Sequence, residues 1–479
     1  MAVLEHLEPK NVFRFFEEMS AIPHGSFNTK AVSDWCAAFA RERGLEHYQD
    51  ETNNVIIIKE ASEGYESAEP VIIQGHLDMV CEKAADCPKD MATEGLDLAV
   101  DGDWVYARGT TLGGDDGIAV AMALAVLDDD SLPHPRLEVI LTTEEEVGME
   151  GAAALDVTPI RGRKLVNIDS EEEGIFTVSC AGGIRTNCVL PVSREAFDGG
   201  VFSVSIGGLS GGHSGVEIHK QRGNADMLLG RVLRAVSVAT DMRVICAGGG
   251  LKDNAIPAES GAVFAVKDSE AAMAAVEMVG GAIKRELQTA DPGVYVRVSP
   301  TEAQQLPMDG DSTKRVICLL TCAPCGVQTM SLDIPGLVQT SLNLGVLETA
   351  EDYVRAAFSI RSSVASEKEM IRDRLVCLTE MLGGSVSFSG DYPAWEYRKD
   401  SPLRELMIEI YKEQYGAEPQ VEAIHAGLEC GLLSAKLPGL DCVSIGPELR
   451  DIHTPRERMS VASVQRVWAF VLEVLRRSK

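Results

Sequence analysis

The chain has 479 residues, 45% apolar and 24% charged, which is typical of a soluble globular protein and long enough for two domains. It has 44 basic and 73 acidic side chains, a net charge of −29, and such an acidic surface disfavours nucleic acid and anionic lipid as partners. The longest apolar run, residues 118–127, is too short to cross a bilayer. We therefore expect neither nucleic acid nor a membrane as a partner.

The N-terminal residues and the cysteines predict a cytoplasmic location. Residues 1–8 contain acids and no basic stretch, which is unlike a signal peptide. The twelve cysteines lie mostly in apolar runs, and without an export signal we interpret them as reduced core thiols. The one Cys-x-x-Cys pair, Cys322 and Cys325, lacks a second pair for a zinc site, so we interpret it as structural.

The first part of the chain alternates predicted helices and strands. Helical apolar spacing and short apolar, often β-branched runs predict, in chain order, helices at 12–19, 31–43 and 118–127 and strands at 55–58, 71–73, 137–141 and 165–168. This alternation predicts an α/β domain with a largely parallel sheet.

The middle of the chain has a different pattern, and the α/β pattern then returns. Strands are predicted at 186–190, 202–206 and 352–362, and helices at 225–238, 271–287 and 367–382. After Pro402 come helices at 403–415 and 461–476 and strands at 420–424 and 442–445. We predict a three-layer α/β/α catalytic domain formed by residues 1–186 and 391–479, interrupted by an α+β domain at 187–390.

Five segments that are far apart in the chain carry residues that typically bind metals. The candidate ligands are a histidine, two aspartates, a glutamate and a second histidine: His76, Asp115, Glu146, Asp169 and His453. Four of the segments follow an apolar, strand-like run, and the carboxyl ends of parallel strands open on one crevice. Two imidazoles and three carboxylates predict a two-metal hydrolase.

Neighbouring residues in these segments have predicted supporting roles. Asp78 lies two residues beyond His76 on the same strand face, where it can accept the second imidazole N–H. Either Asp115 or Asp116 could bind metal, and we choose Asp115; an N-cap acid and a phosphate-binding loop are the alternatives. Glu145 is the predicted general base beside Glu146, with a solvated acidic edge as the alternative.

The charges of these groups balance two divalent ions. Asp115, Glu146 and Asp169 bring three negative charges, and a bridging hydroxide brings a fourth. Mixed imidazole and carboxylate ligands suit two Zn²⁺ ions, with Mn²⁺ or Co²⁺ as alternatives.

At these residues the chain resembles the M20 metallopeptidases, and within them the bacterial aminoacyl-histidine dipeptidases. The resemblance runs along the whole chain and rests on seven sequence words. They are 75–80 (GHLDMV), 108–117 (RGTTLGGDDG), 144–149 (EEEVGM), 169–174 (DSEEEG), 211–215 (GGHSG), 424–431 (IHAGLECG) and 444–447 (SIGP).

The resemblance implies a zinc-peptidase fold with two metal sites that share Asp115. His76 and Asp169 would complete one site, and Glu146 and His453 would complete the other. The inserted domain would be a lid that often mediates homodimer formation. In the dipeptidases of this family the residue after the bridging aspartate is usually Asn, whereas Asp116 stands here.

The resemblance also implies substrate contacts. His213 would donate to the oxyanion, Glu429 would bind the substrate ammonium, and Asn224 would bind the carboxylate. A helix-terminal acid is the alternative for Glu429 and an N-cap for Asn224. His425 is a further candidate for substrate binding, and a structural role is open for both His425 and His219.

The resulting hypothesis is a dipeptidase that acts on small peptides, of the Xaa-His type by resemblance. Metal-bound hydroxide would attack the peptide carbonyl, with Glu145 as general base. One alternative is an aminoacylase, deacetylase or carboxypeptidase of the same superfamily that acts on N-acyl amino acids. The other is a protein that binds metal or peptide without turnover.

Overall fold

The computed structural model describes residues 3–479, which divide into two compact units. Unit 1 comprises the chain up to Ser179 together with residues 397–423 and 428–479, and unit 2 comprises residues 180–396 and 424–427. The main segment of unit 2 therefore begins seven residues before and ends six residues after the predicted middle domain, 187–390. At the first boundary the reason is strand β9 (Gly182–Pro191), which pairs along its whole length with β18 (Tyr353–Ser362) of unit 2.

Unit 1 is built on an eight-stranded mixed sheet in the order β1-β2-β6-β3-β7-β21-β8-β20. In chain order its strands are β1 (Glu46–Gln49), β2 (Val55–Lys59), β3 (Val71–His76), β6 (Leu137–Thr142), β7 (Lys164–Asn167), β8 (Ile175–Cys180), β20 (Gln420–Ile424) and β21 (Asp441–Ser444). The four central strands β6, β3, β7 and β21 are parallel, whereas β2 runs antiparallel to β1 and β6, and β8 runs antiparallel to β21. The expectation of a largely parallel sheet therefore holds only at the centre.

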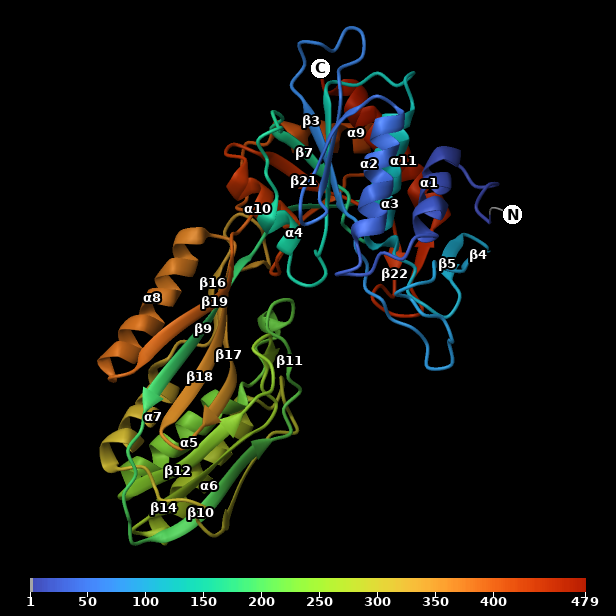
Figure 1. Ribbon diagram of the computed structural model, residues 1–479. Helices are drawn as coiled ribbons and strands as arrows, with labels where there is room; N and C mark the ends of the chain where they lie inside the picture. The colour runs from blue at the N-terminus through green and yellow to red at the C-terminus, as the bar shows by residue number, and fades with distance from the viewer. Residues whose placement is uncertain (1–2) are drawn as a thin grey trace. The chain divides into compact units, whose positions relative to one another are not determined.

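Helices cover this sheet and complete the three-layer fold (Figure 1). They are α1 (Lys10–Ser20), α2 (Lys30–Glu42), α3 (Gly114–Asp128), α4 (Glu150–Ala154), α9 (Pro402–Tyr415), α10 (Glu429–Lys436) and α11 (Val461–Arg477). Helix α3 is apolar on all sides because it packs between β3 and α1, whereas α1 buries one face through Phe13 and Phe16. Helices α9 and α10 pack against β21.

A second, four-stranded sheet of unit 1 has the order β22-β23-β5-β4. Its strands are β4 (Leu98–Asp101), β5 (Trp104–Ala107), β22 (Leu449–Arg450) and β23 (Arg458–Ser460). This sheet was not predicted from the sequence, because its strands are two to four residues long.

Unit 2 is an antiparallel sheet in the order β15-β10-β14-β12-β17-β18-β9-β19, with β16 paired to β17 (Figure 1). Its further strands are β10 (Gly200–Gly207), β12 (Met242–Gly249), β14 (Ser260–Val266), β15 (Tyr295–Pro300), β16 (Gly326–Met330), β17 (Val338–Thr349) and β19 (Ser385–Tyr392). Four helices pack with it: α5 (Ala225–Ala239), α6 (Ser269–Glu286), α7 (Gly310–Cys322) and α8 (Ala365–Met381). A short strand pair, β11 (Gly212–His213) and β13 (Ala255–Ile256), and the 3-10 helix η1 (Ile218–Lys220) complete the unit.

Among residues 3–479, no helix is long and apolar enough to cross a membrane.

Among the described residues, none of the twelve cysteines forms a disulfide and none belongs to a metal-ligating cluster. Three of them, Cys81, Cys322 and Cys377, are exposed, so the interpretation as core thiols is wrong for these.

Candidate metal centre

The central parallel strands of unit 1 bring the predicted ligands to one edge of the sheet. Strand β3 ends at His76, β6 ends two residues before Glu144, and β7 ends two residues before Asp169. Strand β21 lies beside β7 and leads into the loop that carries His453. Because these strands are parallel, their carboxyl ends meet at the same edge.

Asp115 lies between the two predicted histidine ligands. Its Oδ1 is 3.1 Å from Nε2 of His76, and its Oδ2 is 3.2 Å from Nε2 of His453. On the first side, Oδ1 of Asp169 lies 3.5 Å from the same His76 nitrogen, and on the second side Oε1 of Glu146 lies 2.9 Å from His453 Nε2. The five predicted ligands thus form two adjacent groups that share one carboxylate.

The acidic groups of this cluster require positive charge close by. Burial, helped by the Asp115 and Glu146 carboxylates, raises the pKa of Asp169 to about 6. Hydrogen bonds with Asp115 and Glu146 raise the pKa of His453 to about 10. Burial lowers the pKa of His76, but the Asp169 and Asp115 carboxylates outweigh it, so that pKa lies well above its ordinary value. The carboxylates thus favour positive charge on the two imidazoles beside them. Nitrogen and oxygen donors in such a negatively charged cluster fit divalent cations.

Asp116 has a different environment from Asp115. Its Oδ2 accepts a hydrogen bond from the His76 main-chain N–H at 3.1 Å, and the side chain is buried. A Cβ at Gly75 would come within 2.5 Å of this oxygen, which explains the glycine before His76. Among the described residues, His76 forms two groups of potential ligand atoms within 4.8 Å of one another, one with Asp116 and Asp169 and one with Glu145 and Glu146. Asp115 forms such a group with Glu146 and His453, and it is the carboxylate that contacts both histidines.

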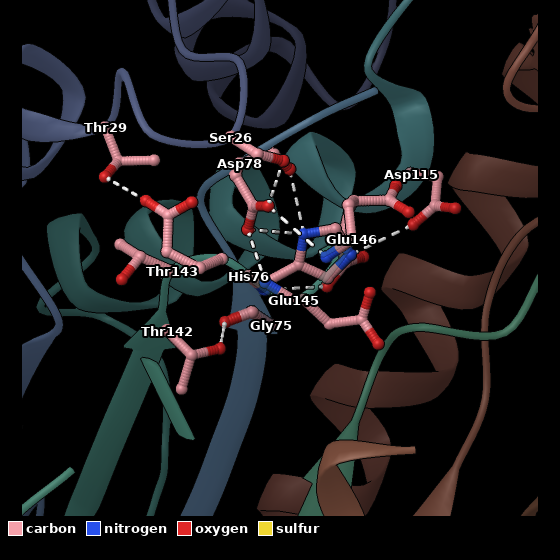
Figure 2. Close-up of polar contacts among 12 residues, drawn as sticks. Ser26, Thr29, Gly75, His76, Asp78, Asp115, Thr142, Thr143, Glu145 and Glu146 are labelled. Carbon is pink, nitrogen blue, oxygen red and sulfur yellow. Dashed lines mark hydrogen bonds and ion pairs between the residues drawn. The ribbon is translucent and has the colours of Figure 1, made fainter. Parts of the chain in front are cut away.

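The three consecutive acids after β6 have three different environments, and Figure 2 labels two of them, Glu145 and Glu146. Glu144 accepts hydrogen bonds from Phe27 N at 2.5 Å and Thr29 Oγ1 at 3.0 Å, so it holds the segment before α2. Glu146 contacts His453. The Glu145 carboxylate makes no hydrogen bond or ion pair with any residue in the described part of the chain, and burial raises its pKa well above the ordinary value.

Asp78 contacts His76 differently from the prediction. The short contact of His76 Nδ1, 2.8 Å, is to the main-chain oxygen of Asp78, while the Asp78 carboxylate lies 3.5 Å away. That carboxylate accepts the main-chain N–H groups of Glu145 and Glu146 at 3.0 and 3.3 Å, and the Ser26 hydroxyl at 2.8 Å (Figure 2). Asp78 therefore fixes both the imidazole and the turn that carries the two glutamates.

Glu429 is a fully buried carboxylate at the start of α10 in unit 1. Its Oε2 accepts hydrogen bonds from Gln74 Nε2 and Thr142 Oγ1, both at 2.6 Å, and each donor lies on a strand that leads to the centre. Its Oε1 has no partner among the described residues, and burial raises its pKa to about 8. A buried acceptor without a partner is rare and indicates room for a donor.

In unit 2, His213 is held as a neutral imidazole. Its Nδ1 accepts hydrogen bonds from the Gly215 and Val216 N–H groups, both at 3.2 Å. A nitrogen that accepts cannot carry the proton, so Nε2 carries it and is a donor. Burial lowers the pKa of His213, and the nearby Arg361 guanidinium lowers it further.

Arg361 is a functional candidate that was not predicted from the sequence. It lies on β18, donates Nη1 to the Tyr392 hydroxyl at 3.1 Å, and has a buried Nε without a partner among the described residues. His425 contacts Ser341 Oγ at 2.7 Å through Nε2, and burial, then Arg361, lowers its pKa to about 3. The only sequence signal for Arg361 was an arginine inside a run of buried strand residues.

Asn224 is engaged within unit 2. Its Oδ1 accepts the Asp226 and Met227 N–H groups at the start of α5, at 3.1 and 3.2 Å. Its Nδ2 donates to Asn343 Oδ1 at 3.0 Å and Leu344 O at 2.8 Å. These contacts match the N-cap alternative and leave Asn224 no free N–H for a substrate carboxylate.

Known proteins are similar to this chain in sequence and in fold. The model of the peptidase family M20/M25/M40 matches residues 72–477. The chain is 37% identical to the cytosol non-specific dipeptidase of Escherichia coli over 480 residues, 99% of each chain. The crystal structure of the aminoacylhistidine dipeptidase from Vibrio alginolyticus superposes with a TM-score of 0.94 at 35% identity, covering 98% of this chain and 97% of that one.

A more distant structure shows how far the fold extends. The aminopeptidase PepT from Bacillus cereus has a TM-score of 0.57 at 15% identity, covering 98% of this chain and 99% of that one, which shows a shared fold alone. The family match and the full-length relative confirm the resemblance noted in the sequence, and the chain belongs to the M20/M25/M40 family of peptidases.

Proposed function

We propose that the protein is a dipeptidase that uses two divalent metal ions to hydrolyse free dipeptides, Xaa-His dipeptides among them. The observation that carries the proposal is Asp115 between His76 and His453, with the unpaired Glu145 carboxylate nearby. The names of the E. coli and Vibrio relatives support the choice of dipeptides.

His76, Asp115 and Asp169 would hold one ion, and Asp115, Glu146 and His453 would hold the other. Mixed imidazole and carboxylate donors suit zinc, with manganese or cobalt as alternatives. Two such ions would supply Lewis acidity, which lowers the pKa of water and polarises a carbonyl.

Glu145 would act as the general base. Its carboxylate is free of other hydrogen bonds among the described residues, and Asp78 holds its main-chain N–H. A carboxylate in this position can take a proton from the attacking water and return it to the leaving amine. A raised pKa suits this task, because the group must bind and release the proton near neutral pH.

Four other residues would bind the substrate. The Nε2–H of His213 would donate to the carbonyl oxygen as it gains negative charge. The free Oε1 of Glu429 would accept the substrate ammonium. Arg361 and His425 would bind the substrate carboxylate, and the unpartnered Nε of Arg361 supports this role.

Several observations bear on the alternatives. A buried acceptor at Glu429 favours a free ammonium over an N-acyl group, which has no charge to offer. An unpaired base beside the centre disfavours a protein that binds without turnover. We also propose a cytoplasmic location, supported by the name of the E. coli relative, and a homodimer formed through unit 2 as a lid, supported by the resemblance alone.

A substrate panel tests the proposal. Purified protein loaded with Zn²⁺ or Mn²⁺ would be assayed on Xaa-His and other dipeptides, tripeptides, N-acetyl dipeptides and N-acetyl amino acids. We expect turnover of free dipeptides and none of the N-acetyl compounds. Turnover of N-acetyl amino acids alone would indicate the aminoacylase alternative, and metal binding without turnover would indicate the binding protein.

A further inference from the structure

Glu457 is a buried carboxylate whose hydrogen bonds all go to one main-chain loop. Its Oε2 accepts the N–H groups of Leu112 and Gly113 at 2.7 and 3.1 Å, and its Oε1 accepts those of Gly114 and Asp115 at 2.8 and 3.4 Å. The side chain is 3% exposed and forms no ion pair among the described residues. Four consecutive N–H groups therefore balance its charge.

The loop from Leu112 to Asp115 is shaped to receive this carboxylate. Gly113 has a φ of +65°, a left-handed conformation that turns successive N–H groups toward one point. A Cβ at Gly114 would lie 3.2 Å from Oε1 of Glu457 and 2.9 Å from Cδ2 of Leu449. Gly113 is thus explained by its left-handed backbone conformation, and Gly114 by close contact with Glu457 and Leu449. Replacing Glu457 would leave buried N–H groups without partners.

The loop that carries Glu457 also carries His453. The Glu457 N–H donates to Thr454 O at 3.0 Å, which closes the turn between the two side chains. This short loop reaches Asp115 twice, through His453 Nε2 to the side chain and through Glu457 Oε1 to the main chain. Asp115 and His453 are therefore held relative to each other by a contact that involves no metal ligand atom.

We propose that Glu457 is a positioning residue that fixes Asp115 against His453, and that it thereby sets the affinity of the metal position formed by Asp115, Glu146 and His453. This inference rests on the proposed two-metal site. Glu457 has no link of this kind to Asp169 or to the His76 side chain, so the other position depends on it less.

Zn²⁺ titration of metal-free protein, with a competing chromophoric chelator, tests the proposal through the two stepwise dissociation constants. We expect Glu457→Gln to weaken one of the two constants by about 10- to 100-fold, the range typical of residues that orient a ligand, and to change the other little. The lost kcat/KM should return in part at high Zn²⁺ concentration, because the ligands themselves are intact.

Glu138→Gln is the matched control. Glu138 is also buried and accepts main-chain N–H groups, from Arg161 at 2.9 Å and Gly162 at 2.8 Å, and it pairs with Arg136. It lies at the opposite end of β6 from the centre. We expect Glu138→Gln to lower the free energy of unfolding without changing either Zn²⁺ constant.

Each outcome decides the question. Unchanged Zn²⁺ constants in Glu457→Gln, or equal weakening in Glu138→Gln, would overturn the inference. If Glu457→Gln does not fold, Gly114→Ala perturbs the same contact from the loop side and should weaken the same constant; an unaltered constant there would overturn it as well. Wild-type protein that binds no second Zn²⁺ would instead refute the two-metal proposal itself.

Discussion

The candidate functional histidines of the two units differ in the charge of their surroundings. In unit 1, His76 and His453 face carboxylates, and their pKa values lie above the ordinary value. In unit 2, burial and Arg361 lower the pKa values of His213 and His425. Unit 1 therefore offers negative charge to cations, and unit 2 offers neutral donors and a guanidinium to anions. A peptide undergoing hydrolysis carries both positively and negatively charged groups.

The largest expected effect comes from removing the free carboxylate of unit 1, that of Glu145. Glu145→Ala should lose about 100-fold or more in kcat while metal content stays at two ions, because a general base contributes about 10²–10⁴. Steady-state kinetics with elemental analysis checks it. Glu144→Ala, next in the chain and bound to Thr29, is the control and should change kcat far less. Unchanged turnover in Glu145→Ala would refute the assigned role.

The second-largest expected effect comes from removing a candidate donor of unit 2, the His213 imidazole. His213→Ala should lower kcat by about 10²–10³ with metal content unchanged, as expected for the loss of one donor to a developing oxyanion. The exposed His219, in the same unit, is the matched control, and His219→Ala should retain activity. A rise in KM without a fall in kcat would contradict a role in the transition state.

A smaller effect is expected when the Arg361 guanidinium of unit 2 is removed, and it should depend on whether the substrate has a carboxylate. Arg361→Met should raise KM for free dipeptides by about 10- to 100-fold, the loss of one charge-assisted hydrogen bond. It should change KM little for dipeptide amides, which have no carboxylate. The comparison of the two substrates in wild type and variant is the measurement, and equal losses on both would exclude carboxylate recognition by Arg361.

The smallest effect concerns a buried carboxyl in unit 2, that of Asp226. Its Oδ1 accepts a hydrogen bond from Ser260 Oγ at 2.6 Å, its Oδ2 has no partner among the described residues, and burial raises its pKa to about 7. In the unfolded chain the pKa of this carboxyl is about 4. Between these values the folded state binds more protons, so the free energy of unfolding falls as pH rises from about 4 to about 7.

Asp226→Asn should remove that decline. Urea unfolding of the metal-free chain should show the variant gaining stability relative to wild type at about pH 8, and gaining none at about pH 4. The gain should reach a few kcal/mol at most. A pH-independent difference between the two proteins would contradict a raised pKa at Asp226.

The candidate centre was predicted from the sequence because three of its ligands, His76, Glu146 and Asp169, lie at the end of a strand or shortly after one. Strands β3, β6 and β7 were recognised from short apolar runs, and parallel pairing then brings their ends together. The contacts that hold the ligands in place could not be predicted from the local sequence pattern. Glu457 meets its partners more than 340 residues earlier in the chain, and the Asp78 main-chain oxygen replaces its carboxylate as the close partner of His76.

Long-range contacts also limit what the sequence can predict in unit 2. Asn224 carries the same local signal as an N-cap and as a substrate ligand, and only its contacts with Asn343 and Leu344 separate the two roles. Arg361 looks like one more strand residue until β18 is placed beside His425 and Tyr392. Unit 2 starts before the predicted boundary at 187, because β9 begins at Gly182, four residues before the strand predicted at 186–190.

The strand order of the unit 1 sheet has a consequence for biosynthesis. Strand β21 is made after the whole of unit 2, yet it lies between β7 and β8, which are made before it. A ribosome must therefore translate the long intervening segment before the sheet can close and His453 can reach Asp115. Until then the nascent chain holds only part of its predicted ligand set.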